Sequence, residues 1–372
     1  MTYFEYFDSF RGILCISVIL FHDGLSLQTL DGFNFGVMGF FILSSFLLTY
    51  RLLKQYENVG MKLKMIVQIT INYIITRLFR IYLPFLVYCY INKYYIGDKE
   101  ITKKNDTMYS MATLTYWPRS THLWTMPIEL RFYVLIPFIA FLFSKLVNNR
   151  NIVLTLFLVN IIVLASIKKY NLIQIGEDNE IATLDRYLPV FCAGSTLALL
   201  YANIEKTNLI KTINNNKMFH YILTIPTGYI FACLMREHAW VQTNVEDAYY
   251  YAIRIVMFML LLLISPLNLI AQYLASERLL KLFGKFSYGA YLFHISVLRY
   301  KNKYPSKLIR IKTDECIAYL SVSLICGIMF YYFIENNLII ISKYFINKID
   351  LVYYKLKYYF LNRRSFNTFK KK

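Results

Sequence analysis

The stretch Phe10–Gly24 reads FRGILCISVILFHDG. Arg11 is followed by ten mostly apolar residues and then by His22. Eleven residues at about 100° each return to nearly the same face of an α-helix, about 16 Å further along its axis. The stretch therefore predicts a membrane helix that carries Arg11 and His22 on one stripe facing an internal cavity. The alternative is that Arg11 pairs with Asp8 at the membrane interface and His22 caps the other end of the helix.

Composition extends this reading to the whole chain. Hydrophobic residues make up 57% of the 372 residues, charged residues make up 17%, and the mean hydropathy is +0.42. The apolar residues come in blocks of about 17–25, the length that crosses a bilayer as a helix. The fold class predicted is an all-α polytopic membrane protein, a bundle of about ten transmembrane helices. They are expected near 9–27, 33–50, 79–96, 124–146, 151–168, 184–202, 218–235, 248–271, 286–299 and 315–341.

Loop charge predicts the orientation. The connection 23–33 has no lysine or arginine, whereas the connection after the second helix is strongly basic. By the positive-inside rule, both termini face the cytoplasm. The connection between the ninth and tenth helices is basic as well and does not fit this topology. Residues 1–345 are expected to form one transmembrane domain and residues 346–372 a basic cytoplasmic tail. The first apolar block is expected to be a retained span, because it lacks a cleavage site.

The formal net charge of +19 does not indicate nucleic acid, because basic residues beside membrane spans usually contact lipid headgroups. Six scattered cysteines, with no paired Cys or Cys/His motif, indicate neither a metal site nor a disulfide framework.

Polar side chains inside three further apolar blocks are candidate site residues. Ser44 lies in GFFILSSFLL, where it suits close helix packing or ligand contact. Arg77 and Arg80 in TRLFRIYLP are one turn apart, so they could grip phosphate groups together or merely anchor the helix at the cytoplasmic interface. Glu129 and Tyr133 share a helix face in HLWTMPIELRFYVLIP, and Glu129 could orient an imidazole or pair with an arginine.

The last stretch, FGKFSYGAYLFHISV, brings Tyr288, Tyr291 and His294 within two turns. His294 is a second imidazole candidate, although a structural hydrogen-bonded role would also explain it.

Taken together and in this order, the five stretches resemble the acyltransferase-three family of integral membrane O-acyltransferases. The resemblance runs from about residue 5 to 340. It includes the Arg-(ten residues)-His first helix, the FFxLSGFLL-like second helix, the R-x-x-RIY segment, the W…E-x-x-FY…P fourth helix and the S-Y-x-x-YLxH ninth helix. Ser45 departs from the usual glycine of the second motif, and Leu130 replaces an acid of the fourth.

The resemblance implies an enzyme of the class EC 2.3.1.- that moves an acyl group, often acetyl, from acyl-CoA to a hydroxyl of a carbohydrate or lipid-linked glycan. It implies His22 as catalytic base, Arg11 as its partner and Glu129 as a site carboxylate. Acyl-CoA or acceptor contacts are expected from Arg77, Arg80, Ser44, Tyr133, Tyr288 and His294. Acyl-CoA, with acetyl-CoA as the common case, is a co-substrate, and no permanently bound cofactor or metal is expected. The expected location is the plasma membrane or, in a eukaryote, an endomembrane.

Two other classes stay open at this point. A flippase or channel would also carry polar groups inside a bundle, and an inactive family member would bind CoA without turnover. Neither the acceptor, the acyl length nor the oligomeric state follows from the sequence.

Overall fold

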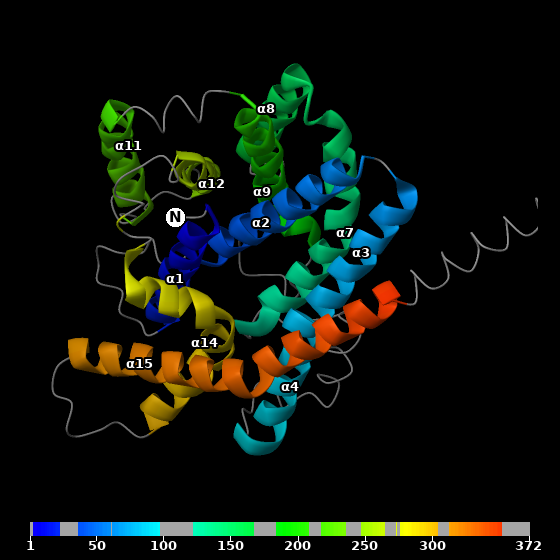
Figure 1. The fold of residues 1–372 in the computed structure, drawn as a ribbon. Coiled ribbons are helices and arrows are strands. Elements are labelled where there is room, and N and C mark those ends of the chain that lie inside the picture. The colour runs from blue at the N-terminus through cyan, green and yellow to red at the C-terminus, as the bar shows by residue number, and fades with distance from the viewer. Residues whose placement is uncertain are drawn as a thin grey trace, which may run out of the picture.

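The structure is a computed structural model that describes residues 3–22, 36–60, 62–96, 122–166, 184–207, 217–235, 247–264, 273, 276–303 and 312–351. Over these ranges the chain is helical apart from short turns, and no strand occurs in them. The predicted all-α class is confirmed. Figure 1 shows the helices gathered around α1, with α2 and α14 beside it and α15 across the outer side of α14.

A helix is found at each of the ten expected segments. The helices are α1 (Tyr3–His22), α2 (Gly36–Val59), α3 (Leu63–Arg77), η2 (Leu78–Tyr82), α4 (Leu83–Ile91), η3 (Asn92–Ile96), η4 (His122–Trp124), α7 (Thr125–Leu146), α8 (Arg150–Ser166), α9 (Leu184–Glu205), α11 (Lys217–Met235), α12 (Asp247–Ile264), α14 (Arg278–Lys303), α15 (Lys312–Phe330) and η6 (Tyr331–Glu335).

Five helical segments of the described chain are both long and apolar enough to cross a membrane: Gly36–Val59, Leu63–Ile96, His122–Leu146, Tyr187–Glu205 and Glu315–Leu351. Charged residues keep α1 and α14 out of this set, since α1 contains Glu5, Asp8 and Arg11. The count of ten spans and the side on which the termini lie stay predictions.

The third membrane helix begins at Leu63 and not near residue 79. It runs unbroken to Ile96 over 34 residues, and the five residues before α4 form a π turn. Pro84 explains this turn, because a proline cannot donate a backbone hydrogen bond to the preceding turn and the helix widens to accommodate it. The Leu83 N–H accordingly bonds the carbonyl of Leu78, five residues back. Such wide turns are common at functional sites.

The last helix also extends further than expected. It passes through a π turn of its own, η6, and continues to Leu351, beyond residue 345. Residues 352–372 of the expected tail lie outside the described residues.

Helix α1 packs parallel to α14 along most of its length. The Cys15 thiol donates to the Ser287 carbonyl at 3.7 Å, and Gly12 lies against Leu280 and Gly284 one to two turns earlier. A Cβ built on Gly12 would lie 2.1 Å from the Leu280 carbonyl oxygen. Only glycine allows this approach, as is typical of helix pairs in membranes.

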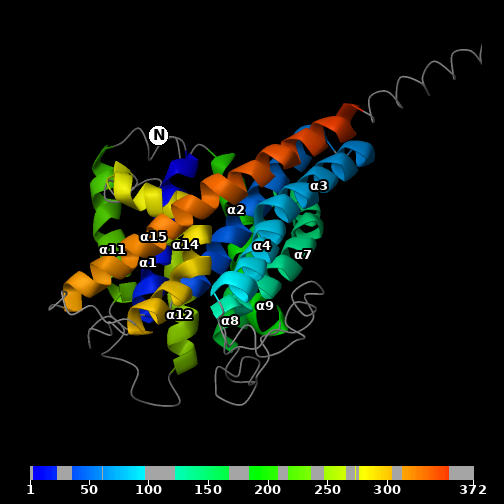
Figure 2. The ribbon, with the colours of Figure 1, turned by 90° about the horizontal axis from the view of Figure 1, so that it is seen from below.

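Other pairs follow the same rule. Helices α2 and α9 run parallel, with Thr49 Oγ1 3.0 Å from Ser195 Oγ. Helix α14 is antiparallel to α15, which it meets where Gly289 faces Gly327. Figure 2 shows α15 crossing the bundle beside α14, and the continuation of this helix after η6 lying beside α3, where Gln68 bonds Asp350. Helices that cross a membrane one after another alternate in direction. The directions of these three helix pairs agree with that alternation.

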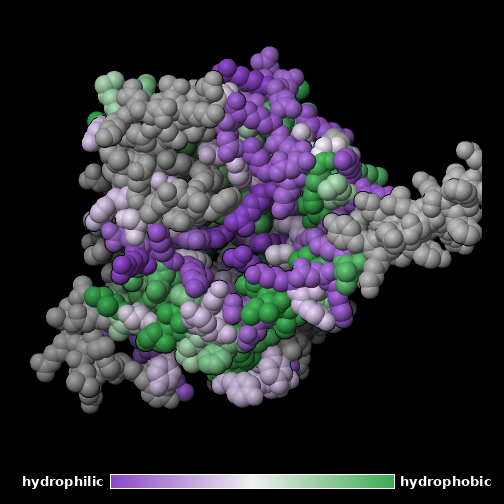
Figure 3. Space-filling view, in the orientation of Figure 1, coloured by the Kyte–Doolittle hydropathy of each residue, from purple (hydrophilic) through white to green (hydrophobic). Residues whose placement is uncertain are grey.

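One end of the bundle carries a polar network that joins α2, α9 and the turn before α8. Lys54 Nζ lies 2.7 Å from the Glu205 carboxylate, and Lys206 Nζ bonds both Glu57 and, at 2.6 Å, Asn148. Figure 3 shows hydrophilic residues gathered on the upper part of this face and apolar residues below them. The ends of α2 and α9 and the turn between α7 and α8 therefore meet at one end of the bundle.

Candidate active site

A cavity of about 310 Å³ lies between α1, α2, η2, α7, α14 and η6. Seven of the nine predicted site residues line it: Arg11, Ser44, Arg77, Arg80, Glu129, Tyr133 and Tyr288. They come from five separate stretches of sequence, so the tertiary fold gathers what the motifs only suggested.

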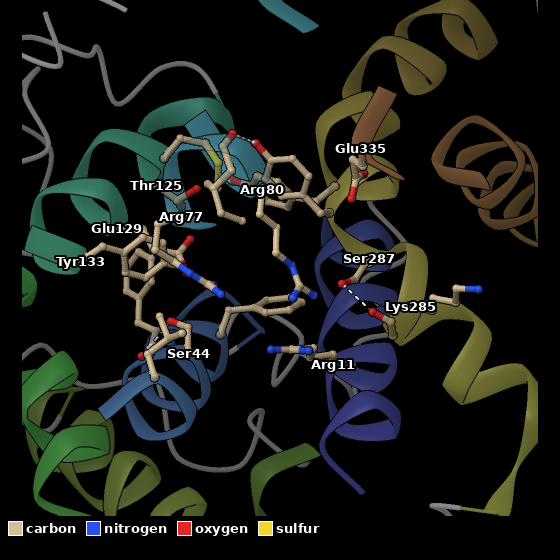
Figure 4. A pocket seen from close by; sticks show the side chains of 18 of the residues that line it. Arg11, Ser44, Arg77, Arg80, Thr125, Glu129, Tyr133, Lys285, Ser287 and Glu335 are labelled. Atoms are coloured by element: carbon tan, nitrogen blue, oxygen red, sulfur yellow. Dashed lines mark hydrogen bonds between the residues drawn. The ribbon is translucent and has the colours of Figure 1, made fainter. Parts of the chain in front are cut away.

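Three arginines define the character of the cavity. Figure 4 shows the guanidinium groups of Arg77, Arg80 and Arg11 pointing toward its middle, the first two from the third membrane helix and the third from α1. The π turn η2 begins directly after Arg77 and contains Arg80, which is exposed. A concentration of like charges this close is costly unless an anion or a set of carboxylates offsets it.

The arginines differ in their partners. Arg11 is bonded to Asp8 at 3.2 Å, the pairing that the sequence suggested as its structural alternative. Arg77 lies 5.8 Å from the centre of the Tyr73 ring, and its Nε is buried with no hydrogen-bond partner in the described part of the chain. Arg77 is thus held in place and still has a donor to offer a ligand.

Glu129 on α7 provides a carboxylate to the cavity, beside Arg77 (Figure 4). The Tyr133 hydroxyl donates to it, as the i, i+4 spacing predicted, and Ser44 on α2 also hydrogen-bonds it. Arg77 and Arg11 attract it electrostatically. Glu129 therefore joins α2 to α7 and faces the arginines, and its hydrogen-bond partners are hydroxyls and not an imidazole.

Glu335 is a cavity residue that the sequence analysis missed. It ends the π turn η6, its side chain is 5% exposed, and its Oε1 has no partner among the described residues. Arg80 attracts it across the cavity. An acid inside the apolar run FYYFIENNLIIIS was the available signal, because intramembrane carboxylates are rare.

Two tyrosines close one side of the cavity. The Tyr288 hydroxyl donates to the Ile81 carbonyl at 2.7 Å and so ties α14 to the π turn η2. The Tyr291 hydroxyl lies 2.7 Å from Thr125 Oγ1 and donates to the carbonyl of His122. Thr125 and Tyr291 both line the cavity.

His22 and His294, the two predicted imidazoles, lie outside this lining. Their ring centroids are 5.0 Å apart in an edge-to-face arrangement. A third imidazole, that of His122, lies 5.1 Å from His294 and 6.1 Å from the Tyr291 ring. The sequence analysis did not single out His122, which stands alone in its motif just before a predicted helix. Tyr291 therefore separates an arginine-lined cavity from a cluster of three histidines.

A backbone carbonyl orients each of these rings. His22 Nδ1 lies 3.0 Å from the Val18 oxygen, and His294 Nδ1 bonds the Tyr291 oxygen. A carbonyl can only accept, so both rings carry their proton on Nδ1 when neutral. The Nε2 of His22 is then a free base.

Comparison with known proteins agrees with the motifs. A model of the acyltransferase-three family, described as an acyltransferase domain, matches residues 4–334. The chain belongs to this family. The resemblance to this family is therefore confirmed.

Individual relatives are more distant. The O-acetyltransferase OatA of Staphylococcus aureus strain NCTC 8325 / PS 47 is 24% identical over 322 residues, which cover 80% of this chain and 51% of OatA. OatA of strain COL gives the same figures. The protein SACOL0978 of strain COL is 25% identical over 335 residues, 82% of this chain and 52% of that protein. The chain thus spans about half the length of these relatives, and no solved structure matches it.

Proposed function

We propose that this chain is a multi-pass membrane O-acyltransferase that moves an acyl group, typically acetyl, from acyl-CoA to a hydroxyl of a carbohydrate or lipid-linked glycan. Family membership and the names of the relatives support the acyl transfer. The donor and the residue roles are inferred from the cavity and from chemistry. The charge of the loops supports termini in the cytoplasm. The long apolar helices support a membrane location, for which we propose the plasma membrane or an endomembrane.

The observation that carries the donor assignment is the convergence of Arg11, Arg77 and Arg80 in one cavity. CoA carries several phosphate charges, and guanidinium groups bind phosphate with two parallel hydrogen bonds. The free Nε of Arg77 is such a donor. Under the proposed orientation, these arginines are reached from the side on which acyl-CoA is made.

His22 is the proposed general base. An alcohol becomes a good nucleophile when a base removes its proton as it attacks the thioester. The Nδ1–H bond to the Val18 carbonyl presents the unprotonated Nε2, the arrangement that a carboxylate provides in hydrolytic triads. As the acceptor oxygen bonds to the acyl carbon, the carbon–sulfur bond breaks, and the proton finally goes to the departing thiolate.

Thermal stabilisation by acetyl-CoA tests the donor site. A ligand that binds only the folded state raises the unfolding temperature. We expect a shift for the full chain in detergent or nanodiscs, its loss in Arg77→Ala/Arg80→Ala, and its retention in Arg150→Ala, an exposed arginine at the start of α8. Equal shifts in all three proteins would contradict the proposal.

Transfer of radiolabelled acetyl groups from acetyl-CoA to cell-envelope glycans and lipids tests turnover. The label should appear in an O-acetyl ester that mild base releases. A CoA-dependent thermal shift without any labelled product would instead identify a CoA-binding scaffold, and the absence of both would favour a flippase.

A further inference from the structure

His294 is the centre of the histidine cluster and the most enclosed of its members. Its side chain has no exposed surface, and its Nε2 is buried without a hydrogen-bond partner in the described part of the chain. An unpaired buried polar atom is costly, so its retention calls for an explanation. The two neighbouring imidazoles supply one.

The carbonyl bonds fix the tautomers of all three rings. His22 and His294 donate through Nδ1, to Val18 and Tyr291, which leaves Nε2 as the lone-pair nitrogen of each. His122 donates through Nε2 to the Leu292 carbonyl at 3.1 Å, which leaves its Nδ1 as the lone-pair nitrogen. The neutral cluster therefore contains three basic nitrogens and no proton shared between the rings.

The rings meet edge to face, with interplanar angles of 74° between His22 and His294 and 82° between His122 and His294. In this arrangement an N–H in the plane of one ring can be directed at a neighbouring ring. That N–H points at the face of the next ring, so its proton reaches the in-plane lone pair of that ring only when one of the rings turns. A second proton would place two cations side by side in a buried site. The geometry favours the uptake of a single proton.

The surrounding groups agree with this reading. His294 is faced by His22 from α1, by His122 from η4 and by Tyr291 from its own helix, where the ring centroids are 5.4 Å apart. On α4, Tyr88 bonds Ser296 and interacts with Arg299 at the end of α14. The Lys301–Glu315 ion pair, 3.7 Å, lies further along. Tyr88, Lys301 and Glu315 thus have the polar partners just named. The rings that face the His294 imidazole are those of His22, His122 and Tyr291.

We propose that His22, His294 and His122 form a proton-sharing cluster that takes up one proton as a unit, with His294 as the positioning residue for His22. The catalytic part of this inference rests on the proposed function; the proton uptake does not. During transfer, the proton of the acceptor hydroxyl moves to His22 Nε2 and is shared with His294 Nε2. It leaves the cluster for the thiolate sulfur once the carbon–sulfur bond has broken, so the cluster ends as it began.

Nitrogen-15 NMR of the full chain, labelled at histidine and held in nanodiscs, tests the cluster without substrate. The chain has five histidines, so single substitutions assign the signals. We expect Nδ1–H tautomers for His22 and His294, an Nε2–H tautomer for His122, and one proton taken up jointly as the pH falls. In His22→Gln the titration of His294 should change. The opposite tautomer at His294, or a His294 titration that is the same with and without His22, would overturn the proposal.

Turnover measured in mixtures of H2O and D2O tests the catalytic part. Protons in flight at two sites give a curved dependence of kcat on deuterium content, and a single proton gives a straight line. We expect a curve for the native protein and a straight line for His294→Phe, together with a roughly tenfold or larger loss of kcat at unchanged KM. Phe293 lies on the same helix as His294 and packs against Tyr88 of α4, and Phe293→Leu should keep the curve.

The outcomes separate the two proposals. A curved dependence in His294→Phe would assign His294 to structure alone. Joint proton uptake by NMR in a protein that transfers no acetyl group would leave the cluster standing and remove the proposed function.

Discussion

A Cβ atom built on Gly284 would lie 1.7 Å from the carbonyl oxygen of Asp8, which is far inside van der Waals contact. Gly284 and Asp8 both line the cavity, so the contact that joins α1 to α14 also forms part of the cavity wall. The position of Arg11, three residues after Asp8, depends on it.

Gly284→Ala should therefore displace α1 from α14. We expect a loss of about 1–3 kcal/mol, the usual cost of overpacking, and a larger loss of acetyl-CoA binding because Asp8 and Arg11 move with the helix. Thermal inactivation and ligand-induced stabilisation would be measured on the same preparation. Leu282→Ala, which removes an exposed side chain from the same helix, is the matched control and should bind the donor normally.

His22→Gln should separate binding from chemistry. His22 does not line the arginine cavity, so acetyl-CoA should stabilise the variant as much as the native protein. The transfer rate should fall about 10²–10⁴-fold, as expected for loss of a general base. Loss of the thermal shift in His22→Gln would place the histidine in the donor site and contradict this division.

Glu335→Gln tests the balance of charge in the cavity. The Glu335 carboxylate offsets the charge of Arg80, and glutamine keeps the shape while removing that charge. An anionic donor should bind more tightly to the variant, by about 1 kcal/mol or less, which is at most roughly fivefold. Titration of CoA at low and high salt measures this, and the gain should shrink as salt rises. Weaker binding at low salt would instead show that Glu335 contacts the ligand directly.

Gly194→Ala addresses the contact between α2 and α9. A Cβ there would lie 2.0 Å from the Ser45 hydroxyl and 2.2 Å from the Ile42 carbonyl oxygen. We expect a loss of about 1–3 kcal/mol in thermal stability. Adding Ser45→Gly should recover only part of it, because the backbone carbonyl stays in the way. Full recovery would mean that the hydroxyl alone sets the distance between these helices.

Much of this arrangement could be predicted from the sequence. Hydropathy located the helices, and helical spacing placed Glu129 with Tyr133 and Arg77 with Arg80. The motifs identified seven of the residues that the fold brings into one cavity. These are local signals, since spacing along one helix determines which side chains share a face.

The rest depends on contacts between distant segments. His122 lies at the site because η4 contacts α14 beside His294. The sequence around His122 does not predict this contact between distant segments. The start of the third helix at Leu63 was missed because its first turns carry Lys64, Gln68 and Asn72, which lower the hydropathy without breaking the helix. Ser45, the departure from the usual glycine of the second motif, faces Gly194 on α9, and the sequence of α2 alone does not indicate that contact.

The parallel pairing of α1 with α14 has a consequence for biosynthesis. Helix α14, the glycine-matched partner of α1, is made later, since Cys15 and Ser287, which are in contact, are 272 residues apart in the chain. At about 5–20 residues per second, the interval is on the order of tens of seconds. During this interval α14 is not yet present to pack against α1, and the Arg11 guanidinium of α1 has Asp8 as its ion-pair partner. The nascent chain therefore depends on the insertion machinery to shelter α1 until late in translation, and mutations at Gly12 or Gly284 should be read first as assembly defects.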